Sequence, residues 1–275
     1  MTSYKSFIKH FLKLLLRPEY RNYYIENEKL KQIEWLKDTP RYTSVATEIL
    51  GKPLQLVDGR SFYYSYKEIF QEQIYRFKAT NDHPLIIDCG SNIGLSIIFF
   101  KQLYPQSKII AFEADPEVFK TLQMNLETFS YNDVEVYNKA LWNQNEIIEF
   151  AVEGADCGKV NIDQIGSDQP KIKIPAICLS NFLSEPVDFL KIDIEGAETT
   201  VLQECRNQLD KVNNLFVEYH SFQNFPQTLD ELLSILKNAG FRFSINTQFA
   251  SSQPFIKKRV RYGMDLQLNI FAYRI

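Results

Sequence analysis

Two short segments place acidic residues and glycines at the ends of apolar runs. The first, LIIDCGSNIG, ends its apolar run at Asp88 and continues through Gly90 and Gly94. Glycines at such a turn let the backbone approach a ligand closely and take positive φ. The second, IIAFEAD, ends its apolar run at Glu113, which would stand at the tip of the neighbouring strand. A glycine turn beside such a carboxylate suits a nucleoside with two ribose hydroxyls and a charged tail, so we predict a site for S-adenosylmethionine.

Competing nucleotide motifs do not fit the first segment. A dinucleotide fingerprint requires G-x-G-x-x-G, and counting from Gly90 its later glycines would fall on Asn92 and Leu95. A P-loop requires G-K-[ST], which the sequence lacks. In the remaining arrangement Asp88 would accept from the ammonium group of the methionine tail or from a water that binds it, and Glu113 would accept both ribose hydroxyls. We expect cofactor contacts from Asp88, Cys89, Gly90, Ser91, Asn92, Gly94, Glu113, Ala114 and Asp193.

Charged residues also end two later apolar runs. In VDFLKIDIEGA, Lys191, Asp193 and Glu195 alternate, so in strand geometry they share one face. In NLFVEYH, Glu218 and His220 share a face for the same reason. Ligands of open α/β sheets bind outside the carboxyl ends of the strands, where the strand order reverses. We therefore predict that one crevice collects these five side chains as catalytic candidates beside the cofactor.

Methyl transfer from a sulfonium is an in-line displacement that discharges a cation. The protein must align the acceptor with the methyl group and remove the acceptor's proton. Asp193 is the first candidate for the general base, because Asp88 and Asp193 would flank the crevice. His220 could act as the base or orient the acceptor. A divalent metal on Asp193, Glu195, Glu218 and His220 is conceivable, but no ligand spacing requires it, so the metal is left unassigned.

Alternating strands and helices from Leu85 onward would position these groups. The expected strands are Leu85–Cys89, Lys108–Glu113, Val134–Asn138, Val187–Asp193, Asn214–Tyr219, Phe241–Thr247 and Leu266–Arg274. The expected helices are Leu95–Tyr104, Pro116–Phe129, Ala197–Leu209 and Thr228–Ala239. Continuous apolar strands predict a parallel sheet covered on both faces, with the last two strands as an antiparallel pair at its edge. Two further β-prone runs, Ile147–Val152 and Lys171–Cys178, interrupt the alternation.

The chain ahead of this alternation is expected to be a separate extension. Residues 1–83 should hold helices and a β-hairpin, and residues 84–275 should hold the cofactor-binding domain. The hairpin is predicted from the Asp58-Gly59 pair between two β-prone runs. Its neighbouring tyrosines make the extension our candidate for a cap on the acceptor side; they are Tyr63, Tyr64 and Tyr66.

Charge and hydropathy limit the kinds of partner and the cellular setting that we expect for the protein. The 275 residues carry a net charge of −3, which gives no reason to expect nucleic acid. The four cysteines are scattered, and no apolar run approaches the roughly 20 residues that span a bilayer, so we expect a reduced, cytoplasmic setting. Residues 4–17 predict a basic amphipathic helix, which we expect to cover its own domain; the alternative is a peripheral contact with an anionic membrane.

A basic run precedes the last expected strand. It consists of Lys257, Lys258, Arg259 and Arg261. Such a run could receive a phosphorylated or lipid-linked acceptor at the rim of the crevice. A solvated loop is the reading we favour.

The chain resembles the FkbM-type S-adenosylmethionine-dependent methyltransferases. The resemblance rests on IIDCGSNIG, IIAFEADP, VYNKALW, FLKIDIEGAE and FVEYH in family order, and it extends roughly from Pro53 to Gly240. It implies the class I methyltransferase (Rossmann-like) fold, an α/β architecture whose seven-stranded sheet has an antiparallel last strand. It also implies that Asn138 and Ala140 lie near the adenine or ribose, and the extra β runs fit the family's decorations.

The same resemblance supplies the class of acceptor. It implies O-methylation of a hydroxyl on a sugar of a glycan or glycolipid, or on a secondary metabolite. Methylation of a protein or nucleic-acid nitrogen is the alternative, but the strand ending in IDIEG lacks the Asn/Asp-Pro-Pro-aromatic loop of nitrogen methyltransferases. A degenerate cofactor-binding scaffold of a glycan-assembly complex is a further alternative, against which the intact Asp88–Gly94 turn, Glu113 and Asp193 argue.

Overall fold

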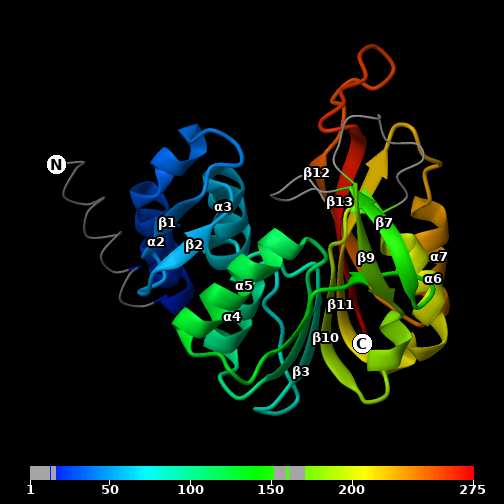
Figure 1. Cartoon of the computed structure of the whole chain (residues 1–275), viewed down its shortest axis with the longest axis horizontal. Helices are drawn as coiled ribbons and strands as arrows, with labels where there is room; N and C mark the ends of the chain where they lie inside the picture. The colour runs from blue at the N-terminus through cyan, green and yellow to red at the C-terminus, as the bar shows by residue number, and fades with distance from the viewer. Residues whose placement is uncertain (1–12, 14–16, 152–158, 161–170) are drawn as a thin grey trace. The chain divides into compact units, whose positions relative to one another are not determined.

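The computed structural model describes residues 13, 17–151, 159–160 and 171–275. The chain divides into two compact units, Met1–Arg76 and Phe77–Ile275 (Figure 1). The amphipathic helix expected over residues 4–17 lies almost wholly outside the described residues, as does Cys157.

The first unit is mainly helical. Its elements are α2 (Pro18–Gln32), η1 (Glu34–Asp38), β1 (Val45–Thr47), β2 (Leu54–Leu56), α3 (Gly59–Tyr66) and the π-helical turn η2 (Lys67–Gln71). Strands β1 and β2 pair antiparallel. Leu36, Leu54 and Tyr66 are fully buried, and the Tyr66 hydroxyl donates to Glu26 Oε2 at 2.6 Å. The unit therefore has a small core of its own.

The hairpin predicted at Asp58-Gly59 is wrong, because Asp58 is the N-cap of helix α3. Its carboxylate accepts from the backbone N–H groups of Ser61 and Tyr42, each at 2.8 Å, and pairs with Arg41 at 2.8 Å. An Asp can cap a helix as well as open a turn, and these contacts from the preceding loop select the cap. Gly59 is required by packing, since a Cβ there would lie 2.5 Å from Thr39 Oγ1. The three tyrosines near it accordingly lie in helix α3.

The division between the units falls ahead of the boundary expected at residue 83. Phe77 already belongs to the second unit, where its ring stacks on Phe189 with centroids 4.9 Å apart. The Tyr104 hydroxyl donates to the Phe77 carbonyl at 2.9 Å. This connecting segment is tied to the second unit by side chains that the sequence pattern does not mark.

The second unit is built on a seven-stranded sheet of order β12-β13-β11-β10-β3-β4-β5. The strands are β3 (Leu85–Cys89), β4 (Lys108–Phe112), β5 (Glu135–Tyr137), β10 (Val187–Ile192), β11 (Val212–Phe222), β12 (Arg242–Phe249) and β13 (Met264–Tyr273). Strand β13 pairs antiparallel with both β11 and β12, and the other pairs are parallel. The last strand is therefore the reversed one, as predicted.

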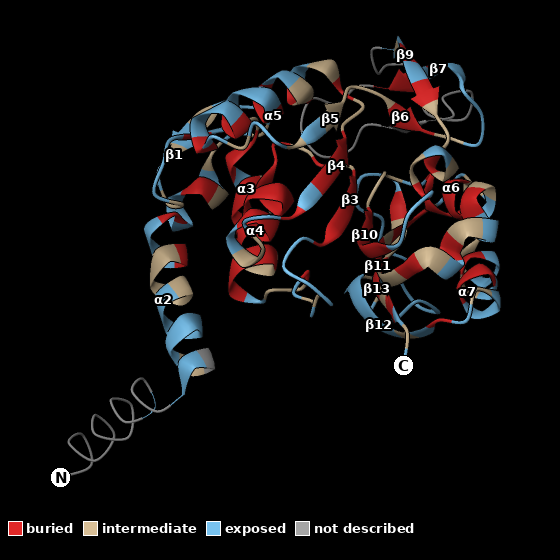
Figure 2. Ribbon diagram, turned by 90° about the horizontal axis from the view of Figure 1, so that it is seen from below, coloured by how far each residue is buried: buried red, intermediate tan, exposed pale blue. Residues whose placement is uncertain are grey.

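Helices cover both faces of this sheet. They are α4 (Leu95–Leu103), α5 (Pro116–Phe129), α6 (Glu198–Cys205) and α7 (Leu229–Asn238). Two 3₁₀ turns accompany them: η4 (Leu179–Phe182) precedes β10, and η5 (Arg206–Lys211) follows α6. Figure 1 shows α4 and α5 on one side of the sheet and α6 and α7 on the other. Every residue of β3 and β10 is buried, which agrees with their mainly apolar sequences (Figure 2). Asp88, Asp188 and Lys191 are charged residues buried with them.

A smaller sheet of order β6-β9-β7-β8 follows strand β5 in the chain. Its strands are β6 (Ala140–Leu141), β7 (Glu146–Ala151), β8 (Lys159–Val160) and β9 (Lys171–Ile177). The two extra β-prone runs predicted from the sequence are strands β7 and β9, and they pair antiparallel. Among the helices of the described residues, none is both long and apolar enough to cross a bilayer.

Candidate active site

The turn between β3 and α4 is shaped by two glycines with positive φ, 85° at Gly90 and 93° at Gly94. The backbone N–H groups of Gly90 and Ser91 donate to the carbonyl of Phe112, at 3.0 and 2.9 Å. A Cβ on Gly90 would lie 1.8 Å from the backbone oxygen of Asp193. The turn thus needs glycine because the ends of β3 and β10 meet there, at the point where the strand order reverses.

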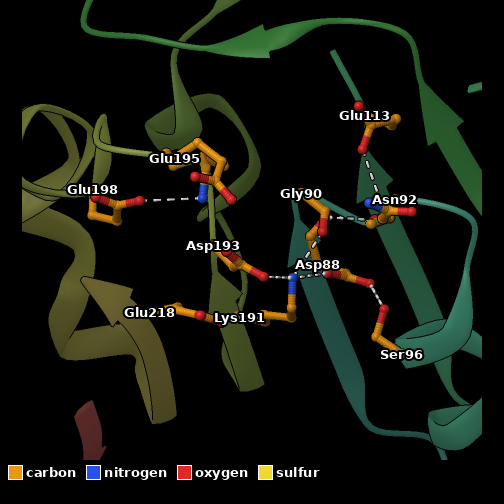
Figure 3. A network of polar contacts seen from close by, with 12 residues as sticks. Asp88, Gly90, Asn92, Ser96, Glu113, Lys191, Asp193, Glu195, Glu198 and Glu218 are labelled. Carbon is orange, nitrogen blue, oxygen red and sulfur yellow. Dashed lines mark hydrogen bonds and ion pairs between the residues drawn. The ribbon is translucent and has the colours of Figure 1, made fainter. Parts of the chain in front are cut away.

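Glu113 is held beside this turn by backbone donors. Its carboxylate accepts from the N–H groups of Asn92 and Asp115, each at 2.9 Å, and Figure 3 shows the bond to Asn92. Burial raises the pKa of Glu113 to about 7, against the two backbone hydrogen bonds that favour the ionised form. The Asn138 side chain donates to the carbonyls of Glu113 and Ala114, at 2.9 and 3.1 Å. The turn after β3, the end of β4 and the segment after β5 therefore meet at Glu113, the first through its carboxylate and the last through its backbone carbonyl.

Asp88 is fully buried beneath the turn. One carboxylate oxygen accepts from the Ser96 hydroxyl, and the other lies 3.4 Å from Nζ of Lys191. Its backbone carbonyl accepts from the Ser91 hydroxyl at 3.0 Å. These contacts give Asp88 a role in holding the turn, and its expected contact with the cofactor's tail stays a prediction.

Lys191 joins the two halves of the site (Figure 3). Its Nζ donates to the Gly90 carbonyl at 2.8 Å and lies 3.3 Å from a carboxylate oxygen of Asp193. Burial acts to lower the pKa of Lys191, but Asp193 and Asp88 outweigh it and hold that pKa above its ordinary value. A buried cation between two carboxylates fixes the end of β10 against the β3 turn.

The strand alternation predicted for Lys191, Asp193 and Glu195 holds only in part. Strand β10 ends at Ile192, and Glu195 lies in the following turn with φ of 56°. That turn is closed by Glu198, whose carboxylate accepts from the N–H groups of Ile194 and Gly196, at 3.3 and 2.9 Å. Glu195 is therefore placed in the site by the left-handed backbone conformation of the turn, and not by the alternation of side chains along a strand.

His220 lies at the centre of an acidic cluster. Its Nδ1 is 3.0 Å from Glu198, and its Nε2 is 3.8 Å from Glu195 and 3.7 Å from Glu218. Burial acts to lower the pKa of His220, but Glu195 and Glu198 outweigh it and raise that pKa well above its ordinary value. Burial in turn raises the pKa of Glu195 well above the ordinary value of a carboxyl group. The imidazole is thus held as a cation among the carboxylates.

Two residues of this cluster were not found from the sequence. Glu198 looks like an ordinary first-turn helix acid, although it anchors both His220 and the turn after β10. Gln267 comes from β13, donates to Glu218, and stands opposite His220 in the antiparallel register. An acid in the first helical turn is the only sequence signal for Glu198, and Gln267 has none.

Part of the cluster could hold a divalent cation. Asp193, Glu195 and His220 each offer one ligand atom, and these atoms all lie within 4.8 Å of one another. Two carboxylates and a neutral imidazole are ligands that divalent metals accept, so a metal bound here would have to displace the proton of His220. Glu218, which we expected as a fourth ligand, is not in this set.

A pocket of about 560 Å³ opens from the same cluster. Glu195 and His220 line one part of it, and Trp142, Phe222 and Phe225 contribute aromatic surface. Thr199 and Gln203 of helix α6 add polar groups. A pocket that combines aromatic walls with a few polar groups next to charged side chains has the composition of a small-molecule site.

The structure therefore brings most of the predicted site residues to the carboxyl edges of β3, β4, β10 and β11. Cys89 and Ala140 are instead buried in apolar clusters, at 0% and 3% exposure. Asp193 is the most exposed member of the charged cluster, at 24% of its side chain. It is followed by Glu195 and Glu218, at 17% and 14%.

The sheet order, the reversed last strand and the glycine turn define the class I methyltransferase fold. The chain matches the methyltransferase FkbM domain over residues 88–243. It belongs to that family of S-adenosylmethionine-dependent methyltransferases, which confirms the resemblance seen in the sequence.

Three relatives and one solved structure illustrate the match. "Methyltransferase 1" of Beauveria bassiana is 28% identical and aligns over 62% of this chain and 82% of its own. Methyltransferase sdnD of Sordaria araneosa is 30% identical and aligns over 56% of this chain and 73% of its own. The 2-O-methyltransferase NoeI of Sinorhizobium fredii is 26% identical and aligns over 50% of this chain and 63% of its own. The crystal structure of methyltransferase FkbM from Methylobacillus flagellatus KT is 15% identical, with a TM-score of 0.46 over 91% of this chain and 59% of that one.

Proposed function

We propose that the protein transfers the methyl group of S-adenosylmethionine to a hydroxyl of a sugar in a glycan or glycolipid, or of a secondary metabolite. The observation that carries the proposal is the position of Asp193. It adjoins the glycine turn on one side and shares a cluster with Glu195 and His220, which line the 560 Å³ pocket, on the other. A relative named as a 2-O-methyltransferase supports a hydroxyl acceptor.

The donor would lie across the carboxyl ends of β3 and β4. Gly90 and Gly94 leave room for its methionine portion, and Glu113 is turned so that its carboxylate could accept the ribose hydroxyls. Asn138 would then stand at the edge of the adenosine, since its side chain is bonded to the backbone carbonyls of Glu113 and Ala114.

Asp193 is the residue we assign as general base. A sugar or alkyl hydroxyl is a weak acid, so a carboxylate that takes its proton contributes typically about 10²–10⁴-fold to the rate. The neighbouring carboxylates raise the pKa of His220, which favours its protonated form, and a protonated imidazole cannot take the acceptor's proton. We therefore assign His220 to positioning Glu195 and Glu218, and through Glu195 the acceptor.

The aromatic surface of the pocket supports an acceptor with a ring-shaped or otherwise extended apolar face. Trp142 and Phe225 present such surface in the pocket that Glu195 also lines. Sugar rings and the scaffolds of secondary metabolites carry both an apolar face and hydroxyls, which matches this lining. The extension predicted over residues 1–83 stays a proposed cap on the acceptor side, motivated by Tyr63, Tyr64 and Tyr66.

Replacement of Glu113 tests the donor site. Glu113→Gln keeps the size of the side chain but removes its charge, so we expect the Kd for S-adenosylmethionine to rise by roughly 10- to 100-fold. Because the pKa of Glu113 is about 7, wild-type affinity should strengthen as pH rises from 6 to 8 and the carboxyl group ionises. Isothermal titration at three pH values measures both effects.

The matched control for this change is Glu117→Gln, because the Glu117 side chain is exposed and pairs with the neighbouring exposed Lys120. The ligand's own amino group titrates identically with every variant, so the difference between variants isolates Glu113. An unchanged Kd in Glu113→Gln, or the same pH dependence as wild type, would show that this carboxylate does not contact the ribose.

A transfer assay tests the proposed reaction directly. The purified protein is incubated with methyl-labelled S-adenosylmethionine and with glycan, glycolipid, small hydroxylated, protein and RNA acceptors. We expect label in a carbohydrate or small-molecule fraction, stable to mild base as an ether is. Label in protein or RNA instead would contradict the assignment of a hydroxyl acceptor.

A further inference from the structure

The connection between β12 and β13, residues 250–263, projects beyond the sheet and belongs to no part of the active site (Figure 1). Two large apolar side chains stand at its tip, Phe255 and Ile256, with exposed fractions of 103% and 82%. Val260 and Tyr262 are also exposed, at 45% and 43%. Adjacent apolar side chains this exposed are uncommon on a protein surface and mark an interaction site.

Basic residues follow these apolar side chains directly. Lys257, Lys258, Arg259 and Arg261 are all exposed, and the sequence from residue 250 to 264 contains no acid. The chain as a whole is acidic, with a net charge of −3, so the loop is a local reversal of charge. A partner that meets this loop must offer negative charge and an apolar interior side by side.

The loop is held in a defined shape by its own backbone. The N–H groups of Ile256 and Lys257 donate to the Gln253 carbonyl, at 3.0 and 2.9 Å, and form a tight turn. Arg259 N–H donates to the Ser251 hydroxyl at 2.7 Å. Phe255 and Ile256 are therefore presented outward by a built turn, and insertion of them into a partner would require little ordering of the chain.

We propose that this loop docks the protein on an anionic lipid bilayer, with Phe255 and Ile256 entering the interface and the four cations meeting lipid phosphates. Lipid headgroups supply the negative charge, and the acyl region directly beneath them accepts the apolar tip. A nucleic-acid backbone would pair with the cations but would leave Phe255 and Ile256 in water. This combination of apolar tip and basic flank favours the bilayer.

The sheet topology gives the docking a direction. Strand β12 is antiparallel to β13, which is antiparallel to β11, so β12 and β11 end at the same edge. That edge carries Glu218 and His220. A bilayer bound by the loop would therefore face the same edge of the sheet as the active site, where a lipid-linked acceptor could be reached. The docking itself does not depend on the proposed reaction.

Vesicle co-sedimentation of the full chain tests the proposal, with phosphatidylcholine vesicles compared with vesicles that also contain phosphatidylglycerol. Wild type should bind only the anionic vesicles, and added salt should weaken the binding. Phe255→Ser with Ile256→Ser should weaken it by at least about tenfold. Replacing the four loop cations with glutamine should weaken it by roughly fivefold per cation.

Matched controls carry the same chemical changes elsewhere on the second unit. Ile147→Ser alters another exposed apolar side chain, and glutamine at four other exposed cations alters the same charge: Lys108, Lys120, Lys171 and Arg206. Unchanged thermal unfolding shows that each variant is folded. Binding that is absent in wild type, or that survives both loop variants, overturns the proposal. Loop-dependent binding to RNA or DNA without binding to vesicles also overturns it and assigns the loop to nucleic acid.

Discussion

Replacing Asp193 with asparagine is expected to lower the kcat of methyl transfer by about 10²–10⁴-fold, because the acceptor hydroxyl loses the group that takes its proton. Asparagine keeps the size of the side chain and can still face Lys191, which lies 3.3 Å away in the wild type. The loss should therefore appear in kcat more than in the Kd for the cofactor. Single-turnover transfer and isothermal titration separate the two quantities.

The control for this change is Asp230→Asn, an exposed acid in the first turn of helix α7. Its turnover should match that of wild type. If Asp193→Asn also keeps wild-type turnover, the base is a different group, and Glu195 becomes the next one to replace because it lines the pocket. A variant that loses cofactor binding as well would place Asp193 in the donor site instead.

Gly90→Ala is expected to abolish measurable cofactor binding and to destabilise the second unit. A Cβ at this position would lie 1.8 Å from the Asp193 backbone oxygen, so the end of β10 or the turn must move. The positive φ of 85° adds strain for alanine. We expect the free energy of unfolding to fall by roughly 3 kcal/mol or more. Urea unfolding and isothermal titration measure the two effects.

Gly263→Ala separates the clash from the backbone strain. Gly263 has a φ of 79°, but its nearest neighbour would be 3.9 Å from the added Cβ, an ordinary contact. This variant should lose only about 1 kcal/mol and keep cofactor binding. Equal losses in the two variants would mean that φ alone explains the requirement for glycine at position 90, and that the approach of β10 is unimportant.

Much of the second unit could be predicted because its signals are local. Strands β3, β4 and β10 are mainly apolar in sequence, and each is followed by residues that do not continue a buried strand, such as the Gly90 turn after β3. Their order then followed from the family resemblance, and the reversed strand β13 confirms it. The two extra β-prone runs were also predicted from the sequence, whereas their antiparallel pairing as β7 and β9 is seen only in the structure.

The predictions that the structure contradicts are those in which one local sequence pattern permits two structures. Asp58-Gly59 is compatible with a hairpin turn and with a helix start, and contacts from Arg41 and Tyr42 selected the helix. Glu195 lies three residues beyond the end of β10 at Ile192, in the turn that Glu198 closes, so strand alternation does not apply to it. Neither the helix start at Asp58 nor the turn at Glu195 can be predicted from the helix or strand propensities of the neighbouring residues.

Residue types and their order along the chain are enough to identify which residues could do chemistry and the strand ends near which they lie. Glycine, aspartate and glutamate at the ends of apolar runs are sufficient for that, because burial and backbone freedom are properties of single residue types in a short window. The contacts between those groups, and hence their effects on one another's charge, are visible only in the folded chain. Lys191 bridges Asp88 and Asp193, and Glu198 and Gln267 complete the surroundings of His220. Charge and protonation depend on distances between elements remote in the chain, and packing alone sets those distances.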